Sequence, residues 1–219
     1  MDDLKIIIET KSCAFPGSGE GYGSVVDRDV VFDDWGLPYL PARRIKGVLR
    51  ESALEVKEML EQSDSTANVL DTSMSDVFGE EGQREGSRLI ISDFYLQEHS
   101  AFQDWIKWLC FEYKALFSPA VVMDYFTQIR QQTSIDPNGL AEEGSLRRSR
   151  VLKKGLFFEG KVTLLEGDLK EINLLALACA NMRRFGGQRN RGFGEVRVTL
   201  FEGEKNCSDE ALALLEGGN

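Results

Sequence analysis

The chain has 219 residues, of which 42% are hydrophobic and 10% aromatic, a composition typical of folded globular proteins and not of disordered ones. Its formal net charge is −10, so the protein as a whole is strongly acidic. The longest apolar runs are too short to cross a bilayer, and acidic residues follow Met1 where a signal peptide carries basic ones. The composition therefore predicts a cytoplasmic protein that does not interact with a membrane.

The acidic and basic residues are unevenly distributed along the chain. Residues 51–81 carry nine acidic residues and one lysine, which is typical of a solvated surface. Residues 43–50, 128–154 and 183–197 are instead rich in lysine and arginine. Because binding follows the local potential rather than the total charge, these basic segments favour a phosphate-bearing ligand despite the acidic average.

Histidine and cysteine, common ligands of transition metals, are sparse. The sequence has one histidine, His99, and four widely separated cysteines with no CxxC spacing. These counts exclude a histidine-rich metal site and predict ordinary free thiols.

The N-terminal half is expected to contain one strand, a glycine-rich loop and one long helix. β-Branched residues favour the strand, and apolar residues at three- and four-residue spacing favour the helix. The expected ranges are a strand over 4–15, a loop over 16–23, an extended segment over 24–32, a turn over 35–41, a helix over 42–62 and an irregular acidic insertion over 63–86.

The C-terminal half repeats strands and helices around a polar, basic excursion. Trp105, Trp108 and Phe111 recur every three residues, so we expect a helix that packs these aromatic rings into the core. The expected ranges are strands over 87–96, 155–165 and 193–201, helices over 101–117, 170–185 and 208–215, and the excursion over 123–154.

This order of elements predicts an α+β fold with a ferredoxin-like, RRM-like βαββαβ core. We expect a single domain over residues 1–219, with the acidic insertion at 63–86 and a protruding hairpin within 123–154.

Residues 183–194 combine four glycines with four arginines, between a predicted helix and a predicted strand. Glycine lets the backbone approach a ligand closely, and the arginine guanidinium suits phosphate oxygens. This segment is therefore a candidate phosphate-binding loop, with the candidate residues Arg184, Gly186, Gly187, Gln188, Arg189 and Arg191.

The start of the helix at residue 42 is a second candidate phosphate site. Lys46 and Arg50 are four residues apart, so they lie on the same side of the helix. Free backbone amides and the positive end of the helix dipole favour an anion there. Arg43 and Arg44 are close enough in sequence to line the same groove.

Several motifs together resemble one known family. The segment GLPYLPARRIKGVLR over residues 36–50, VFG over 77–79 and GGQRNRGFGEV over 186–196 follow one another as in the RAMP superfamily of CRISPR-associated proteins. The chain most resembles the backbone subunits of type III effector complexes. This resemblance implies guide RNA, target RNA and other CRISPR effector subunits as partners.

In that family, a "thumb" hairpin occupies the place of residues 123–154 and inserts between bases of the guide–target duplex. The resemblance implies that this segment is a thumb. Apolar and arginine side chains are suited to unstacking bases. The candidates here are Ile129, Arg130, Thr133, Leu146, Arg147 and Arg148.

The resemblance also makes metal-dependent RNA cleavage a candidate activity. Some family members cut target RNA with an aspartate of the first glycine-rich loop, and this chain offers Asp27 first and Asp29 second. The usual catalytic position corresponds here to Tyr22 or Gly23, so the sequence leaves cleavage open. Magnesium is expected only if the chain cuts RNA.

Two alternative functions use the same residues differently. A guide-precursor-processing ribonuclease of the same superfamily would use His99 as its acid or base. A ferredoxin-like protein that binds a phosphorylated small molecule would use the glycine–arginine loop but would not need the basic excursion.

Overall fold

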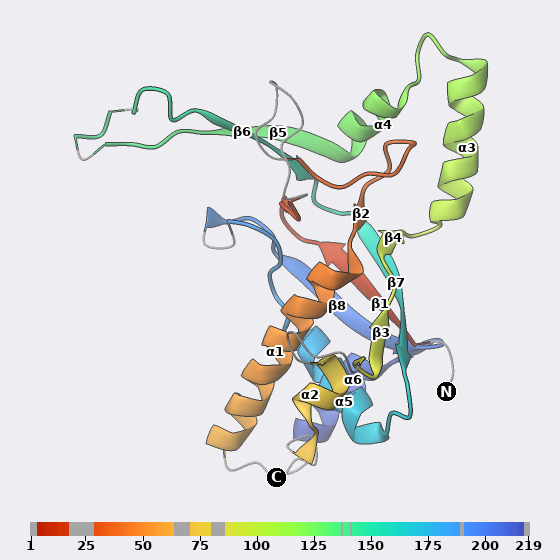
Figure 1. The fold of residues 1–219 in the computed structure, drawn as a ribbon, viewed down its shortest axis with the longest axis vertical. Helices are drawn as coiled ribbons and strands as arrows, with labels where there is room; N and C mark the ends of the chain where they lie inside the picture. The colour runs from red at the N-terminus through yellow and green to blue at the C-terminus, as the bar shows by residue number, and fades with distance from the viewer. Residues whose placement is uncertain are drawn as a thin grey trace.

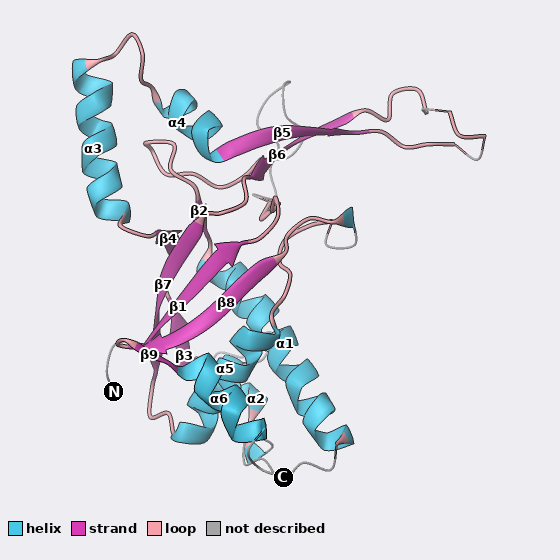
Figure 2. Cartoon of the chain, turned by 180° about the vertical axis from the view of Figure 1, so that it is seen from behind, coloured by secondary structure: helices cyan, strands magenta, loops and turns pink. Residues whose placement is uncertain are grey.

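The structure is a computed structural model of the chain, shown in Figure 1 and from behind in Figure 2. It describes residues 4–17, 29–63, 71–79, 86–136, 138–140, 142–188 and 191–216.

The main body is built on an antiparallel sheet with the strand order β2-β4-β7-β1-β8-β9, and β3 also pairs with β7. The central strand β1 pairs with β7 on one side and with β8 on the other. The strands are β1 (Leu4–Thr10), β2 (Tyr39–Leu40), β3 (Leu89–Ile91), β4 (Phe94–Leu96), β7 (Phe157–Leu164), β8 (Val196–Glu202) and β9 (Lys205–Asn206).

Four of the helices in the described ranges cover one face of this sheet. In Figure 2 the strands β7, β1 and β8 face the viewer, and the helices lie behind them. They are α1 (Ala42–Gln62), α2 (Met74–Phe78), α5 (Leu169–Asn181) and α6 (Cys207–Glu216). The expected α+β class is confirmed, and the order of the central elements is β1, α1, β3 with β4, β7, α5 and β8.

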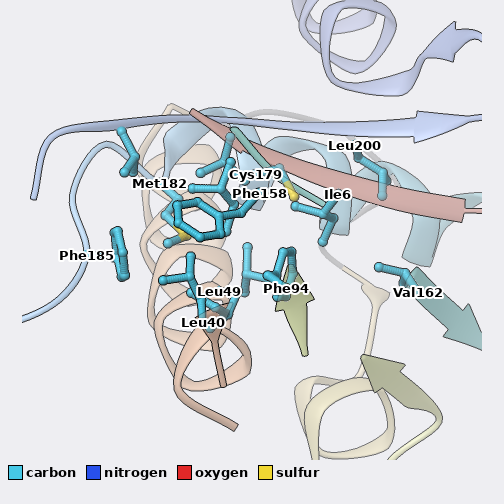
Figure 3. Packing of buried hydrophobic residues seen from close by; sticks show 14 of the residues in the cluster. Ile6, Leu40, Leu49, Phe94, Phe158, Val162, Cys179, Met182, Phe185 and Leu200 are labelled. Atoms are coloured by element: carbon cyan, nitrogen blue, oxygen red, sulfur yellow. The ribbon is translucent and has the colours of Figure 1, made fainter. Parts of the chain in front are cut away.

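The core lies between the helices and the sheet, as Figure 3 shows. Along β1, side chains alternate between buried and half-buried positions, and Ile6 and Ile8 are fully enclosed. Phe94 and Phe158 enter the same core from β4 and β7. Each fully buried side chain of this size stabilises the fold by about 2 kcal/mol, so this core holds the helices against the sheet.

The second part of the molecule consists of two helices and a hairpin beyond one end of the sheet. The strands β5 (Thr127–Gln132) and β6 (Arg147–Leu152) form a separate two-stranded sheet. Figures 1 and 2 show this hairpin and the helix pair projecting toward opposite sides of the molecule. The helices are α3 (His99–Glu112) and α4 (Pro119–Phe126).

The structure corrects the prediction for the α3 aromatic residues. Trp105, Trp108 and Phe111 are 57%, 49% and 70% exposed, so they do not pack into the core. The expected helix is present, but Ile106 and Leu109 are its buried residues. The three-residue spacing predicted an aromatic stripe along the helix, but it did not indicate whether this stripe faces the core or the solvent.

Two further predictions are corrected in part. The strand expected over 87–96 is divided into β3 and β4, because the ladder with β7 is interrupted at Ser92 and Asp93 and resumes with its register shifted by one residue. The insertion expected to be irregular contains a short helix, α2, whose Val77 and Phe78 are buried. Other parts of that insertion lie outside the described residues.

Candidate nucleic-acid interface

A short segment after β1, residues 13–15, contacts both the β5–β6 hairpin and the glycine–arginine loop. Ala14 forms an isolated bridge with Leu152, the last residue of the hairpin. The carbonyl of Phe15 accepts a hydrogen bond from the Gly187 amide at 2.8 Å, and the carbonyl of Cys13 accepts from Gly194 at 2.8 Å. Residues 13–15 therefore fix the hairpin and the glycine–arginine loop against each other, although the two are far apart in sequence.

Two glycines allow this close packing. Gly186 has φ of 85°, and a Cβ there would collide with the carbonyl oxygen of Phe15. Gly194 has φ of 76°, and a Cβ there would collide with the carbonyl of Phe185. Only glycine satisfies both the positive φ and the close backbone approach. The glycines of this loop thus shape it, while the arginines supply its charge.

The hairpin and the loop enclose a polar groove of about 750 Å³, which we call the hairpin groove. Arg147 reaches it from β6, and Gln188 and Arg191 reach it from the loop. Its lining residues are Gln132, Thr133, Ser134, Ile135, Ser145, Arg147, Ser149, Gln188 and Arg191. The structure therefore places parts of two predicted RNA-binding segments in one concave surface.

The register of the hairpin divides the predicted wedge residues between two faces. Gln132 pairs with Arg147, and Ile129 pairs with Arg150. Since side chains alternate along a strand, Arg130 and Arg147 lie on one face, while Ile129 and Arg148 lie on the other. Arg147 lines the hairpin groove, and Arg130 NH2 lies 3.8 Å from the Cys13 sulfur.

A second groove, of about 470 Å³, lies between the start of α1 and the same loop; we call it the α1 groove. Arg43 and Arg44 line it from the helix, and Gly186 lines it from the loop. Glu51 adds one acidic group to its wall. The glycine–arginine loop lines both grooves, with Gly186 in the α1 groove and with Gln188 and Arg191 in the hairpin groove.

Two of the α1 basic residues make contacts within the protein. The Arg44 guanidinium donates to the carbonyl of Pro16 and so ties the first glycine-rich loop to the helix. The Lys46 ammonium donates to the Ser87 hydroxyl and, at 2.7 Å, to the carbonyl of Leu89. Burial lowers the pKa of Lys46 from its ordinary value of 10.5. By contrast, Arg43 and Arg50 are exposed.

A carboxylate at the start of α1 was missed by sequence reasoning. The Ala42 amide donates to Asp93 Oδ1 at 2.7 Å. One of the amides expected to be free for phosphate is thus already satisfied, and the Asp93 charge offsets the helix dipole. The residues are 51 positions apart, so no local pattern indicates this contact.

Asp29, the second catalytic candidate, is buried and paired. Its Oδ1 lies 3.3 Å from Arg150 Nε and accepts from the Val30 amide at 2.8 Å. Arg150 NH1 also donates to Asp124 Oδ1 at 2.6 Å and to the Thr127 hydroxyl at 3.2 Å. This arrangement lets Asp29 anchor the base of the hairpin.

Asp27 and Arg189 lie outside the described residues. Elsewhere in the described ranges, His, Cys, Asp and Glu side chains form no group of three or more that could hold a metal ion. His99, the first residue of α3, lines neither groove. Its Nε2 lies 3.1 Å from Asp33 Oδ2.

Comparisons with known proteins agree with this fold. The model of the RAMP superfamily matches residues 7–197, so the chain belongs to the RAMP superfamily. No curated protein matches the sequence. None of the helices that the structure describes is long and apolar enough to cross a membrane.

Two solved structures share the fold at low sequence identity. The first is a cryo-EM structure of the Type III-B Cmr-beta bound to cognate target RNA; the similarity has a TM-score of 0.62 and 12% identity over 91% of this chain and 97% of the other. The second is the apo state of Type III-B Cmr-beta, with a TM-score of 0.63 and 14% identity over 92% and 98% of the two chains.

Proposed function

We propose that the chain is an RNA-binding subunit of a type III CRISPR ribonucleoprotein, where it holds guide RNA and its target duplex. The observation that carries this proposal is the convergence of Arg147, Gln188 and Arg191 on the hairpin groove. Guanidinium and amide donors in a polar groove suit a phosphate backbone, which dominates the affinity of proteins for RNA. Membership of the RAMP superfamily and the Cmr-beta fold similarity support the same function.

The core and the hairpin have the roles that the family resemblance implies. The central order β1, α1, β3 with β4, β7, α5 and β8 supports a ferredoxin-like core. The β5–β6 hairpin is the thumb in this proposal, and its two faces have separate roles. Arg147 binds backbone phosphates in the hairpin groove, while Ile129, which is 43% exposed on the other face, contacts bases.

The binding proposal is tested by comparing ligands of different length. Fluorescence anisotropy with the purified protein should give tight, salt-dependent binding of a single-stranded RNA and weak binding of a mononucleotide. A groove that tracks several phosphates gains affinity with length, whereas a small-ligand site does not. Tight binding of the mononucleotide with weak binding of RNA would favour a protein that binds a phosphorylated small molecule.

Cleavage is a separate part of the proposal, with Asp27 as its candidate and Mg²⁺ as the implied ion. The Asp29 pairing with Arg150 favours an anchoring role for Asp29 instead. The test is target-RNA cleavage by the assembled complex in Mg²⁺ or EDTA, with wild type and Asp27→Ala. Loss of a metal-dependent cut with RNA binding retained makes Asp27 catalytic. Unchanged cutting at every position excludes Asp27 as the catalytic residue and leaves the chain with a guide-holding role.

A further inference from the structure

Strand β8 forms an open edge of the main sheet along most of its length (Figure 2). On one side it pairs with β1 over residues 196–202, whereas on the other side β9 pairs only with Phe201 and Glu202. No strand of the described residues pairs with that second side over residues 196–200. An open strand edge presents main-chain donors and acceptors to which a further strand can pair.

The protein covers both ends of this edge with its own acceptors. The Val196 amide donates to the Arg183 carbonyl at 2.9 Å. The Leu200 amide donates to the Ser208 hydroxyl at 3.0 Å. Because main-chain groups point to opposite sides of a strand at alternate residues, Val198 also presents its amide and carbonyl away from β1.

The main chain of Val198 lacks a partner on this side. Among the residues that the structure describes, none forms a hydrogen bond with its amide or carbonyl there. Val198 is 4% exposed and lines a groove of about 580 Å³, which we call the β8 groove. Nearly all main-chain groups of buried residues are hydrogen-bonded, so an unpaired donor and acceptor beside a groove indicate a ligand that supplies both.

The β8 groove is separate from the proposed RNA path. Arg183 lines it beside Val196, and Asp209 and Leu212 line it from α6. None of its lining residues lines the hairpin groove or the α1 groove. Basic and acidic side chains both line it, so it does not favour a polyanion such as RNA.

We propose that the β8 groove binds an extended peptide segment of a partner protein, which adds an antiparallel strand beside Val198. In such a pair, one residue of the peptide exchanges both N–H···O bonds with Val198. The inference goes beyond the proposed function, since nothing in this contact involves RNA.

The pleat of β8 determines which side chains the segment carries. Val196, Val198 and Leu200 are buried in the core on the helix side of the sheet. Arg197 is exposed on the other face. The peptide residue opposite Val198 therefore points toward the helices, where Leu212 is 43% exposed. An aliphatic side chain fits that position, and uncharged polar side chains fit the positions on either side.

The test is an NMR titration of the isotope-labelled protein, without RNA, with a capped five-residue peptide. The peptide has a central valine between two threonines and a glycine at each end. We expect saturable shifts at residues 196–200 and in α6, and slower hydrogen exchange of the Val198 amide when the peptide is bound.

The matched control peptide carries an N-methyl group on its central valine. This change removes the donor that would bond to the Val198 carbonyl and leaves every side chain unchanged. The control should bind about tenfold more weakly or worse, because a main-chain hydrogen bond is lost and the carbonyl stays unpaired.

Two variants of the protein test the same contact from the other side. Leu212→Glu should weaken peptide binding about tenfold, since it places a charge beside the aliphatic side chain. Leu214→Glu is its control, because Leu214 is 66% exposed on α6 and does not line the groove. Val198→Pro removes the amide that faces the peptide and none that faces β1, so binding should be lost. Leu212→Glu keeps the test decisive if Val198→Pro fails to fold.

Absence of saturable shifts at residues 196–200 with millimolar peptide, or equal binding of the N-methyl peptide, would overturn the inference. A Val198 amide that is protected only at concentrations at which the protein dimerises would mean that a second copy occupies the edge, and would equally overturn it. RNA anisotropy on the same samples keeps the two proposals distinct. Peptide binding by a protein that does not bind RNA contradicts the proposed function alone.

Discussion

The basic residues of α1 and those of the hairpin groove carry the same charge in different surroundings. Arg44 and Lys46 contact carbonyl and hydroxyl oxygens of the protein itself. Arg147 and Arg191 are exposed along the wall of a polar groove. A basic residue of a motif therefore stabilises the fold where oxygens of the protein surround it, and is available to a ligand where it lies exposed along a groove.

The largest expected effect is on RNA binding through the hairpin groove. Reversing both charges, with Arg147→Glu and Arg191→Glu together, should weaken binding of a single-stranded RNA about a hundredfold at low salt, because two phosphate contacts become repulsive. The salt dependence should become shallower by about 0.7 for each phosphate contact that is lost. Fluorescence anisotropy over a salt series measures both quantities.

The matched control is Lys161→Glu with Arg197→Glu, which reverses two exposed charges on the face of the sheet opposite the helices. This pair changes the net charge equally, so its effect should be a few-fold at most. Equal loss in the two double variants would mean that the total charge and not the groove determines affinity.

The next effect concerns the base of the hairpin. Asp29→Ala should lower the free energy of unfolding by about 2 kcal/mol, because Arg150 then lies buried with fewer partners. Asp124 and Thr127 still contact Arg150, which keeps the loss below that of a fully isolated charge. Urea denaturation gives the energy, and amide exchange of residues 127–152 should accelerate.

Asp124→Ala is the comparison for that substitution. Asp124 is 72% exposed, so its pair with Arg150 should contribute less than about 1 kcal/mol. If Asp124→Ala destabilised the protein more than Asp29→Ala, Asp29 would not be the anchor of the hairpin.

A smaller effect is expected at Lys46. Lys46→Met should lower stability by about 1 kcal/mol, since two hydrogen bonds are lost while Ser87 can still donate to the Leu89 carbonyl. RNA affinity should change less than about twofold, in contrast to the hairpin-groove variant. A loss of RNA affinity without a loss of stability would mean that Lys46 binds RNA and does not stabilise the fold.

The pH dependence of stability provides a second check on Lys46. Its pKa is lowered by burial, so the unfolded chain binds this proton more tightly than the folded chain does. The cost of burying the charge is therefore present at neutral pH and disappears as the pH rises through the lowered pKa toward 10.5. Wild type should gain stability relative to Lys46→Met in that range, as measured by urea denaturation at each pH.

The smallest effect is expected at Gly47, which lines the α1 groove within a helix. A Cβ there meets no atom within 4 Å. Gly47→Ala should therefore stabilise the protein by about 0.5–1 kcal/mol, because glycine is a poor helix residue. A decrease in thermal stability would contradict this expectation, because it would mean that the added methyl group clashes with atoms that line the α1 groove.

Local patterns predicted the central elements well. The expected helix over 42–62 has the bounds of α1, and β7 and β8 lie within or close to their expected ranges. These segments have clear apolar periodicity and pack into one core, so local and tertiary preferences agree. The division at Ser92 and Asp93 was not predictable, because it depends on the distant α1 and β7.

The candidate site could be predicted by residue type but not by partner. The sequence indicated Arg147 as a basic residue of the expected thumb and Arg191 as one of the glycine–arginine loop, and the fold places both along one groove. The contacts of Lys46 with Ser87 and of Asp29 with Arg150 span 41 and 121 positions. No short-range spacing carries that information, and the exposure of Trp105 likewise depends on which stripe of α3 meets the body.

The most direct test of RNA binding along the hairpin groove is photo-crosslinking of the protein to a single-stranded RNA that carries photoreactive uridines, followed by identification of the linked peptides. The groove predicts crosslinks in residues 127–152 and 183–194. Crosslinks confined to the face of β1, β7 and β8 opposite the helices would contradict it.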